Sequence, residues 1–335
     1  MYKLIIFLTT VALCVTGCEK RSANGQPATV TPAKRTPQAG DLIKADPIVG
    51  NLRYVPSGVF TQGSPVTEPG RNSNEAQFIH NLTRNIAVME TEVTRQMWAT
   101  LRNVQSSLPA DPSALSGTNQ ALDVPVQQIP WDETILFANL LSLHEGLTPC
   151  YYSDASYTKP IARTDYKSNA NFAEMLELKS TVYCNWSVNG YRLPSEGEWE
   201  YFCRAGSITP FSVVEPNYSS SNCATSNPSP TLSGLDKIAW WSGNSNATSP
   251  VGKKAANQWN LMDVHGNVWE WCWDWDGEYK SGSVTDYFGP DSGTQRIIRG
   301  GSYAVNSQYC RSSFRFRGAP EGWNITIGFR LVRSL

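Results

Sequence analysis

Two stretches carry the strongest structural signals, residues 191–200 (YRLPSEGEWE) and residues 263–271 (DVHGNVWEW). In the first stretch, Ser195 and Glu198 have the spacing of a capping box, in which each side chain binds a backbone N–H group of the other residue. A short helix is therefore expected to begin after Ser195. It is expected to stop near Gly206, because glycine readily takes the left-handed conformation that ends helices.

The second stretch continues through residue 275 as an alternating pattern, which predicts a strand. Four tryptophans fall on one side of this strand. Because large rings dominate burial, Trp269 and Trp271 are assigned to the core, and Trp273 and Trp275 are left open. The opposite side carries smaller or acidic residues: Glu270, Cys272 and Asp274.

Weaker signals complete an α+β pattern with long irregular connections. Thr94 is expected to cap a helix through Leu101, and Asp132 a second helix. Extended segments are expected at three places, the last of which would form a central strand that holds the C-terminus in the fold. These segments are residues 296–303, 310–317 and 327–332.

Residues 1–17 have the pattern of a secretory signal peptide. Lys3 precedes an apolar run over residues 4–15, which is shorter than the roughly 20 residues that cross a bilayer. The sequence VTGC at residues 15–18 resembles a bacterial lipobox, which implies cleavage before Cys18 and lipid on its sulfur. We therefore expect an anchor in a bacterial cell envelope. Glu19 follows the lipid site and favours the outer membrane.

Residues 18–47 are expected to be a flexible tether, and residues 48–335 a single folded domain. The tether is rich in Pro, Ala, Gln, Thr, Gly and Lys and has no periodic apolar pattern, so it cannot bury enough surface to fold. The net charge of −1 shows no basic excess, which argues against a nucleic-acid partner.

Six cysteines remain beyond the lipid site: Cys150, Cys184, Cys203, Cys223, Cys272 and Cys310. An oxidising envelope allows disulfides, but the spacing leaves their pairing open. None belongs to a CxxC pair and the chain has three histidines, so no metal site is assigned.

An ordered set of motifs resembles the formylglycine-generating, sulfatase-modifying family. The resemblance covers nearly everything after the tether and implies an α+β fold of the C-type-lectin type, with short helices around small twisted sheets and many irregular loops. The motifs are residues 60–64 (FTQGS), 90–94 (ETEVT), 191–200, 263–271, 299–302 (RGGS) and 328–330 (GFR).

The resemblance implies that the oxidases of this family bind copper through two cysteines that lie five residues apart. Here Cys310 falls on the second position, whereas the first is Val305. Copper(I) prefers soft thiolate ligands, and one thiol cannot hold it. We therefore expect no enzyme activity and no cofactor, with a copper oxidase as the alternative. His265 is expected to be packed and hydrogen-bonded, not catalytic.

Three oxygen-bearing residues leave one further alternative open. Asp263, Asn267 and Glu270 could hold a structural calcium ion through oxygen ligands. Carboxylates that cap backbone groups have the same sequence pattern, so the residues alone do not choose between these two roles.

A narrower resemblance concerns residues 299–332, which look like the variable region of the variable proteins of diversity-generating retroelements. Its frame is residues 299–302, 310–312, Arg315, Pro320 and 327–330. Adenine-directed mutagenesis rewrites asparagine-type codons between the frame positions in that group, and most intervening residues here are reachable from such codons, Trp323 excepted. The resemblance implies ligand binding by Tyr303, Ala304, Val305, Asn306, Ser307, Tyr309, Phe314, Phe316, Arg317, Gly318, Gly322, Trp323, Asn324, Ile325 and Thr326.

The composition of this stretch supports a binding surface, because rigid aromatics with small polar residues are typical of paratopes. We expect the intervening residues to be mostly exposed on one face, with Phe314 and Phe316 on the same side of a strand. The partner would be an extracellular protein or glycan, contacted at the cell surface. The alternative is a set of ordinary loop and core positions in an envelope scaffold lipoprotein.

Overall fold

The largest sheet joins both ends of the folded chain. Its order is β1–β2–β5–β18–β10, with every neighbouring pair antiparallel. The last strand of the chain, β18, lies between β5 and β10, so the C-terminus is held in the fold as expected. The strands are β1 (Leu42–Asp46), β2 (Gly50–Val55), β5 (Ile86–Met89), β18 (Val332–Ser334) and β10 (Tyr191–Arg192).

This computed structural model describes residues 35–115, 121–169, 172–178, 181–215, 217–219, 223 and 232–335. The chain divides into residues 1–36 and residues 37–335, and the fold concerns the second unit. The signal peptide and Cys18 lie outside the described residues. The predicted tether is wrong at its end, because residues 42–46 form β1: alternate backbone groups of this segment pair with β2, which a solvated linker would not do.

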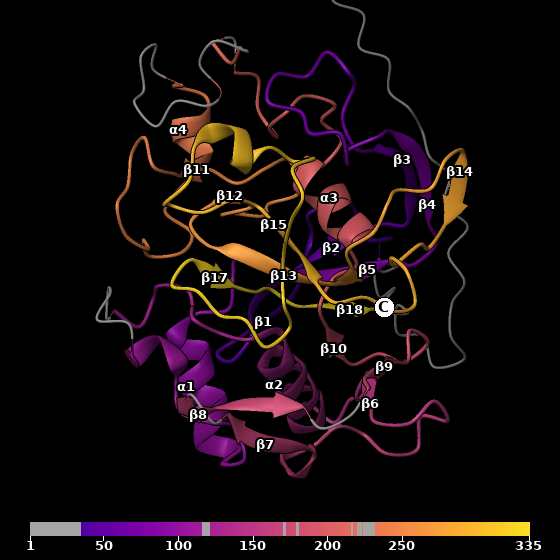
Figure 1. The fold of residues 1–335 in the computed structure, drawn as a ribbon, viewed down its shortest axis with the longest axis vertical. Helices are drawn as coiled ribbons and strands as arrows, with labels where there is room; N and C mark the ends of the chain where they lie inside the picture. The colour runs from indigo at the N-terminus through magenta and orange to yellow at the C-terminus, as the bar shows by residue number, and fades with distance from the viewer. Residues whose placement is uncertain are drawn as a thin grey trace, which may run out of the picture. The chain divides into compact units, whose positions relative to one another are not determined.

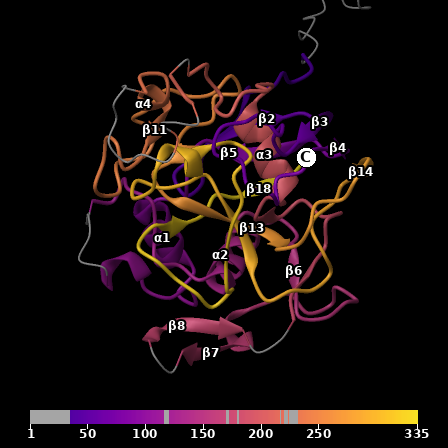
Figure 2. The same cartoon turned by 45° about the horizontal axis from the view of Figure 1, so that its top comes forward.

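A second sheet has the order β16–β15–β13–β17. Its centre, β13, pairs antiparallel with β15 and parallel with β17. In Figures 1 and 2, α3 (Glu196–Arg204) lies on one side of β13, and α1 (Arg95–Val104) and α2 (Trp131–His144) lie on the other. The strands are β13 (Trp269–Trp275), β15 (Arg296–Arg299), β16 (Phe316–Gly318) and β17 (Ile327–Gly328).

The alternation along β13 decides which residue meets which layer. Trp271 is completely buried, and its indole N–H donates to the carbonyl of Ile129, just before α2. Cys272 faces the opposite way and packs in a separate core cluster with Trp199 of α3. The assignment of Trp269 and Trp271 to the core is thus confirmed.

Smaller strand groups flank these sheets. A three-stranded sheet has the order β14 (Ser283–Thr285), β4 (Phe78–Leu82) and β3 (Gly58–Gln62). Two-stranded pairs are β6 (Tyr151–Tyr152) with β9 (Tyr183–Cys184), β7 (Tyr166–Asn169) with β8 (Phe172–Leu178), and β11 (Ala239–Trp240) with β12 (His265–Gly266).

The helices are short, and two of them begin at side chains that cap their N-terminal N–H groups. Thr94 caps α1 (Arg95–Val104), and Ser195 with Glu198 forms the capping box of α3 (Glu196–Arg204), both as predicted. The predicted cap of α2 (Trp131–His144) is wrong, because Pro130 is its N-cap and Asp132 lies in the first turn. A fourth, short helix is α4 (Leu235–Ile238).

The predicted central strand at residues 327–332 is also wrong, because the segment divides between two sheets. Ile327 and Gly328 pair with β13, and β18 then pairs with β5. Between them the buried Arg330 donates to Glu270 and to the carbonyls of Met89 and Met262, which holds the crossing in place. The small sheets, short helices and many loops form the α+β fold of the C-type-lectin type that the motifs indicate.

Candidate functional site

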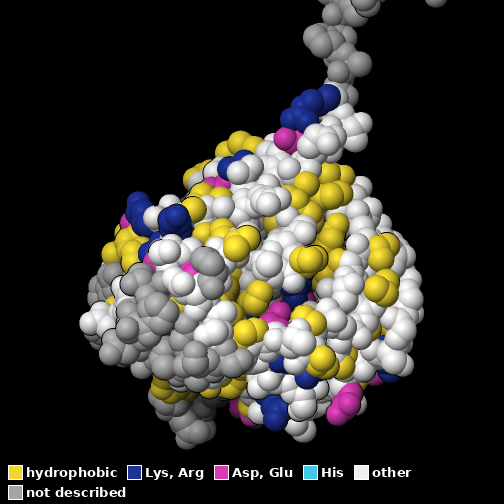
Figure 3. All heavy atoms as spheres, turned by 90° about the horizontal axis from the view of Figure 1, so that it is seen from above, with side chains coloured by type: hydrophobic (Ala, Val, Ile, Leu, Met, Phe, Trp, Pro, Cys, Tyr) yellow, Lys and Arg dark blue, Asp and Glu magenta, His cyan; other side chains and the backbone are white. Residues whose placement is uncertain are grey.

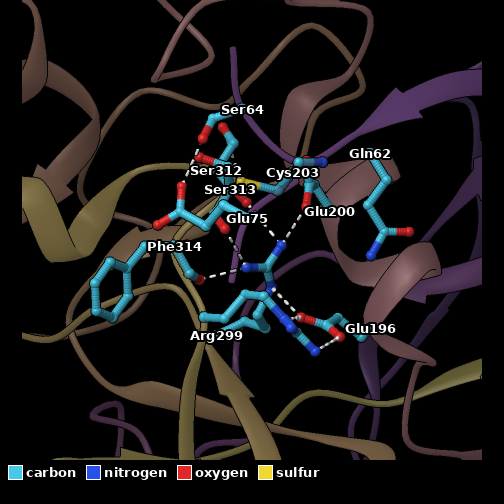
Figure 4. A network of polar contacts seen from close by, with 12 residues as sticks. Gln62, Ser64, Glu75, Glu196, Glu200, Cys203, Arg299, Ser312, Ser313 and Phe314 are labelled. Atoms are coloured by element: carbon cyan, nitrogen blue, oxygen red, sulfur yellow. Dashed lines mark hydrogen bonds and ion pairs between the residues drawn. The ribbon is translucent and has the colours of Figure 1, made fainter. Parts of the chain in front are cut away.

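Arg299, at the end of β15, is completely buried and organises the segment that follows it. Its Nη2 donates to Oε2 of Glu200 at 2.5 Å, and its Nη1 donates to the carbonyls of Ser313, at 2.8 Å, and Phe314. Figure 4 shows this guanidinium between Glu200, Glu196 and the residues before β16. A buried charge is stable only when paired and hydrogen-bonded, so these contacts fix the backbone at 312–314 against α3.

Two further buried arginines continue this anchoring. Arg311 binds Glu68 and Glu75, with Nη2 to Oε1 of Glu75 at 2.8 Å. Arg315 binds Glu196, with Nε to Oε1 at 2.6 Å. Burial alone would raise the pKa of Glu196, but the charge of Arg315 holds it below the usual value of 4.5. The frame arginines Arg299, Arg311 and Arg315 therefore point inward and are held there by ion pairs.

The chain turns outward directly after Arg315. Phe316 is 44% exposed, and the adjacent Arg317 forms an ion pair with Asp276 at 2.8 Å across the surface. These side chains line a shallow groove of about 420 Å³. Its other lining residues are Asn72, Ser73, Asn74, Phe314 and Arg315. This groove is the candidate ligand site.

An aromatic row connects the groove to the core. Phe316 stacks on Trp269 with ring centroids 5.1 Å apart, and Trp269 also contacts Phe314 at 5.9 Å. Tyr309 meets Phe314 edge to face at 4.8 Å. The exposed ring of Phe316 therefore packs on buried aromatic rings, which fix its position and leave its outer face accessible.

The predicted site residues divide into three groups by burial. Exposed are Ala304, Phe316, Arg317, Asn324 and Ile325, and half-buried are Val305, Asn306, Tyr309, Gly318, Gly322, Trp323 and Thr326. Tyr303, Ser307 and Phe314 are buried, contrary to expectation. Exposure thus concentrates at β16 and in the loop that precedes β17.

Local geometry explains the three buried residues. Tyr303 N–H donates to the carbonyl of Asn267, which draws residue 303 against the interior, and Ser307 Oγ donates to the carbonyl of Cys223. Phe314 and Phe316 do not share a side, because β16 begins only at Phe316. The sequence pattern also predicts that both rings form an exposed aromatic patch with Tyr303, Tyr309 and Trp323. This prediction is wrong, because Tyr303 and Phe314 are buried and, of the five, Phe316 is the exposed one.

The groove also contains residues that sequence reasoning missed. Asn72, Ser73 and Asn74 lie in a loop more than 200 positions earlier, so no local pattern connects them to residues 314–317. Asp276 directly follows the tryptophan-rich strand, and its position one residue beyond β13 was the available signal. Figure 3 shows one face of the molecule, on which hydrophobic side chains lie in several groups among polar ones.

The residues at the family's copper positions do not fit copper. Cys310 is completely buried, and burial raises the pKa of its thiol to about 12, so it is protonated at neutral pH. Val305 is half-buried and packs against apolar clusters. A thiolate pair is what copper(I) requires, and this pair offers one protonated thiol and an isopropyl group.

His265 is satisfied on both ring nitrogens. Its Nδ1 lies 2.8 Å from the carbonyl oxygen of Cys310, and its Nε2 accepts the N–H of Ser212 at 3.1 Å. The carbonyl requires a proton on Nδ1, so the ring is neutral, and burial lowers its pKa to about 4. This histidine is a structural bridge.

The possible calcium ligands cap backbone groups and bind arginine. Asp263 accepts the N–H of Gly252 at 2.7 Å, and Asn267 accepts the N–H of Ser249 at 3.0 Å. Glu270 binds Arg330. Within the described part of the chain, no three His, Cys, Asp or Glu side chains are grouped to hold a metal ion. The six cysteines beyond the lipid site are all buried and unbridged.

The chain is similar to a known protein family over most of its length. The model of the sulfatase-modifying factor enzyme 1-like domain matches residues 44–335. The chain belongs to this family. This chain is 30% identical to the chaperone protein LppX of Paenibacillus barcinonensis over 261 residues. The match covers 72% of this chain and 78% of LppX.

Formylglycine-generating enzymes are also similar to this family member. The enzyme of Streptomyces coelicolor is 31% identical over 170 residues, which is 46% of this chain. The match spans half the length of that enzyme and 41% of the length of the mouse enzyme. The family therefore includes enzymes as well as a protein named for chaperone activity.

Solved structures show the same fold. Treponema denticola variable protein 1 superposes with a TM-score of 0.67 and 27% identity, covering 85% of this chain and 95% of that one. PvdO from Pseudomonas aeruginosa superposes with a TM-score of 0.66 at 22% identity, covering 90% of this chain and all of that one. The second likeness concerns the fold alone.

Proposed function

We propose that this protein is a non-catalytic, ligand-binding member of its family, with a diversified C-terminal site displayed at the bacterial surface. The observation that supports this proposal most directly is the change from buried to exposed side chains after Arg315. Arg299, Arg311 and Arg315 of the frame are buried and held by ion pairs, whereas Phe316 and Arg317 turn out into a groove. Such a frame tolerates substitution at the outward positions without loss of the fold.

The chemistry of the groove suits recognition of a protein or glycan surface. Phe316 supplies a rigid ring, and the amides of Asn72 and Asn74 with the charge of Arg317 supply hydrogen bonding around it. Aromatic anchors surrounded by adaptable polar groups are typical of paratopes. The likeness to Treponema denticola variable protein 1 supports the same interpretation.

Absence of catalysis is part of the proposal. The first copper position is Val305, and Cys310 is buried and protonated. The formylglycine-generating relatives keep the oxidase as the competing function, and assay of that activity separates the two.

The envelope location is likewise proposed. Processing before Cys18 would leave a lipid-anchored protein, with the residues that follow it as a tether. Glu19 favours the outer membrane. Within the part of the chain that the structure describes, no helix is long and apolar enough to cross a membrane.

Sequencing tests the diversified site directly. The gene's 3′ end would be sequenced from many cells, together with the neighbouring DNA. We expect a near-copy of this end beside a reverse-transcriptase gene, and substitutions at the codons for residues such as Phe316 and Arg317 but not Arg311 or Arg315. An invariant 3′ end with no template copy would refute diversification.

A chaperone role is a second candidate, favoured by the extended similarity to LppX. The test is suppression of heat-induced aggregation of citrate synthase by the purified domain. Suppression that persists in the Phe316→Ser variant would favour this candidate over the groove as the functional site.

A further inference from the structure

Arg296, at the start of β15, is a buried arginine enclosed by indole rings. Its side chain is 3% exposed. The guanidinium carbon lies 3.5 Å from the ring centroid of Trp275, 3.8 Å from that of Trp131 and 4.9 Å from that of Trp273. Rings above and below a guanidinium stabilise its charge through their faces but leave its N–H edge to be satisfied by acceptors.

The N–H edge of Arg296 is only partly satisfied. Nη1 donates to the carbonyl of Trp273 at 2.5 Å, and the buried Nε has no hydrogen-bond partner. In contrast to Arg299, Arg311, Arg315 and Arg330, Arg296 forms no ion pair with the described residues. Burial lowers its pKa to about 9, which still leaves it charged at neutral pH.

The nearest acidic groups are engaged elsewhere. Asp274 accepts the N–H of Glu196 at 2.7 Å, and Asp132 accepts the N–H of Leu178 at 3.2 Å. Both favour the charge of Arg296, but neither forms an ion pair with it. A buried charge with an unsatisfied donor is costly, so its retention points to an anionic partner.

Arg296 lines a cavity of about 610 Å³, which is within the size range of small-molecule sites. Aromatic rings form much of its wall, including Trp186, which stacks on Phe288 with centroids 4.8 Å apart. Trp131 in this wall is the first residue of α2, and Pro130 offers that helix end no side-chain cap. Asp132 in the first turn of α2 also lines the cavity and offsets the positive end of the helix dipole, so Arg296 is the group in this wall that would attract an anion.

We propose that this cavity binds a small organic carboxylate whose body is a ring with an apolar face. Arg296 would bind the carboxylate through its guanidinium, and the aromatic walls would pack against the ring. The cavity shares no lining residue with the groove at Phe316, so it is a second site with its own ligand. Because the wall residues are not among the predicted variable positions, its specificity would stay constant while the groove changes.

Isothermal titration calorimetry on the purified chain tests this proposal. The probes are two acids, glucuronate and phenylacetate, and their neutral counterparts, glucose and phenylacetamide. We expect at least one acid to bind ten or more times more tightly than its neutral counterpart. The acid that binds shows whether the ring is a sugar or an aromatic. Equal binding of acid and neutral compound, or no binding of any probe, would overturn the proposal.

Substitution identifies the group responsible. Arg296→Gln should abolish the preference for the acid, whereas Arg102→Gln, which removes an exposed arginine from α1, should leave it unchanged. Retained preference in Arg296→Gln contradicts the assignment. If that variant does not fold, Phe288→Ala serves instead. This substitution removes a half-buried ring from the cavity wall and should weaken binding of the acid about tenfold. Unchanged affinity would count against the cavity as the binding site.

Discussion

Phe316 stacks on Trp269 with ring centroids 5.1 Å apart and ring planes inclined by 27°. Trp269 belongs to the core, whereas Phe316 is 44% exposed. The core residue Trp269 thus supports the ring of Phe316, which is a candidate for ligand contact. A different side chain at residue 316 would meet the same Trp269 ring, which is why the fold can remain constant while this position changes.

Replacing Phe316 and Phe314 by serine separates the two positions. Phe316→Ser should lower the free energy of unfolding by about 1 kcal/mol, because an exposed ring loses little burial. Phe314→Ser should cost about 3–5 kcal/mol, because that ring is buried between Tyr309 and Trp269. Chemical denaturation measures both. Equal costs would mean that Phe316 is a core residue.

Asp263 predicts a specific pH dependence. Burial raises its pKa from 3.8 to about 6. A carboxyl group with a raised folded-state pKa contributes stability that is full below about pH 4 and is lost as the pH rises through about 6. The size of this pKa difference corresponds to a loss on the order of 3 kcal/mol.

Asp263→Asn should therefore flatten the stability curve between about pH 4 and 6. The amide oxygen can still accept the N–H of Gly252, so the local turn is retained. The exposed Asp291→Asn is the matched control and should keep the wild-type curve. Denaturation midpoints measured across this range check the prediction, which fails if both variants behave alike.

The purified domain should not convert the cysteine of a sulfatase-type peptide to formylglycine when supplied with copper. Val305 offers no thiolate, and the Cys310 thiol is protonated at neutral pH. Mass spectrometry of the peptide detects the aldehyde. Val305→Cys supplies the missing thiol and is the informative comparison for copper(I) affinity. Aldehyde formation by the wild-type chain that disappears in Cys310→Ser would establish the oxidase.

Cys18→Ser should release the protein from the envelope membrane, because the cysteine sulfur is the attachment point for lipid. Membrane fractionation and metabolic labelling with a fatty acid check this outcome. Cys14→Ser is the matched control, since residue 14 would leave with the signal peptide. A Cys18→Ser variant that stays in the membrane fraction would remove the claim of lipidation.

Residues close in sequence determined much of the fold. The capping box of Ser195 and Glu198 needs only a three-residue spacing, and it forms as predicted. The alternation that places Trp271 in the core is likewise local, because successive side chains of a strand point to opposite faces. The chain of motifs extends this reasoning to the C-type-lectin fold.

Contacts between distant segments decided the remainder. Residues 327–332 read as one apolar strand, but the ion pair of Arg330 with Glu270 holds the chain where it leaves one sheet for another. Phe314 and Phe316 differ in burial because β16 begins between them and Trp269 lies beneath the strand. The exposure of a side chain depends on what packs over it, and a periodic pattern does not contain that information.

Arg296, at the second site, also has properties that the sequence determines and others that only the tertiary structure decides. Its sequence neighbours give no sign that it lacks a carboxylate partner or that Trp131, from more than 160 positions earlier, covers its guanidinium. An arginine's charge is determined by its residue type. Whether that charge is paired, caged by rings or left for a ligand is determined by the side chains that folding brings within a few ångströms of it.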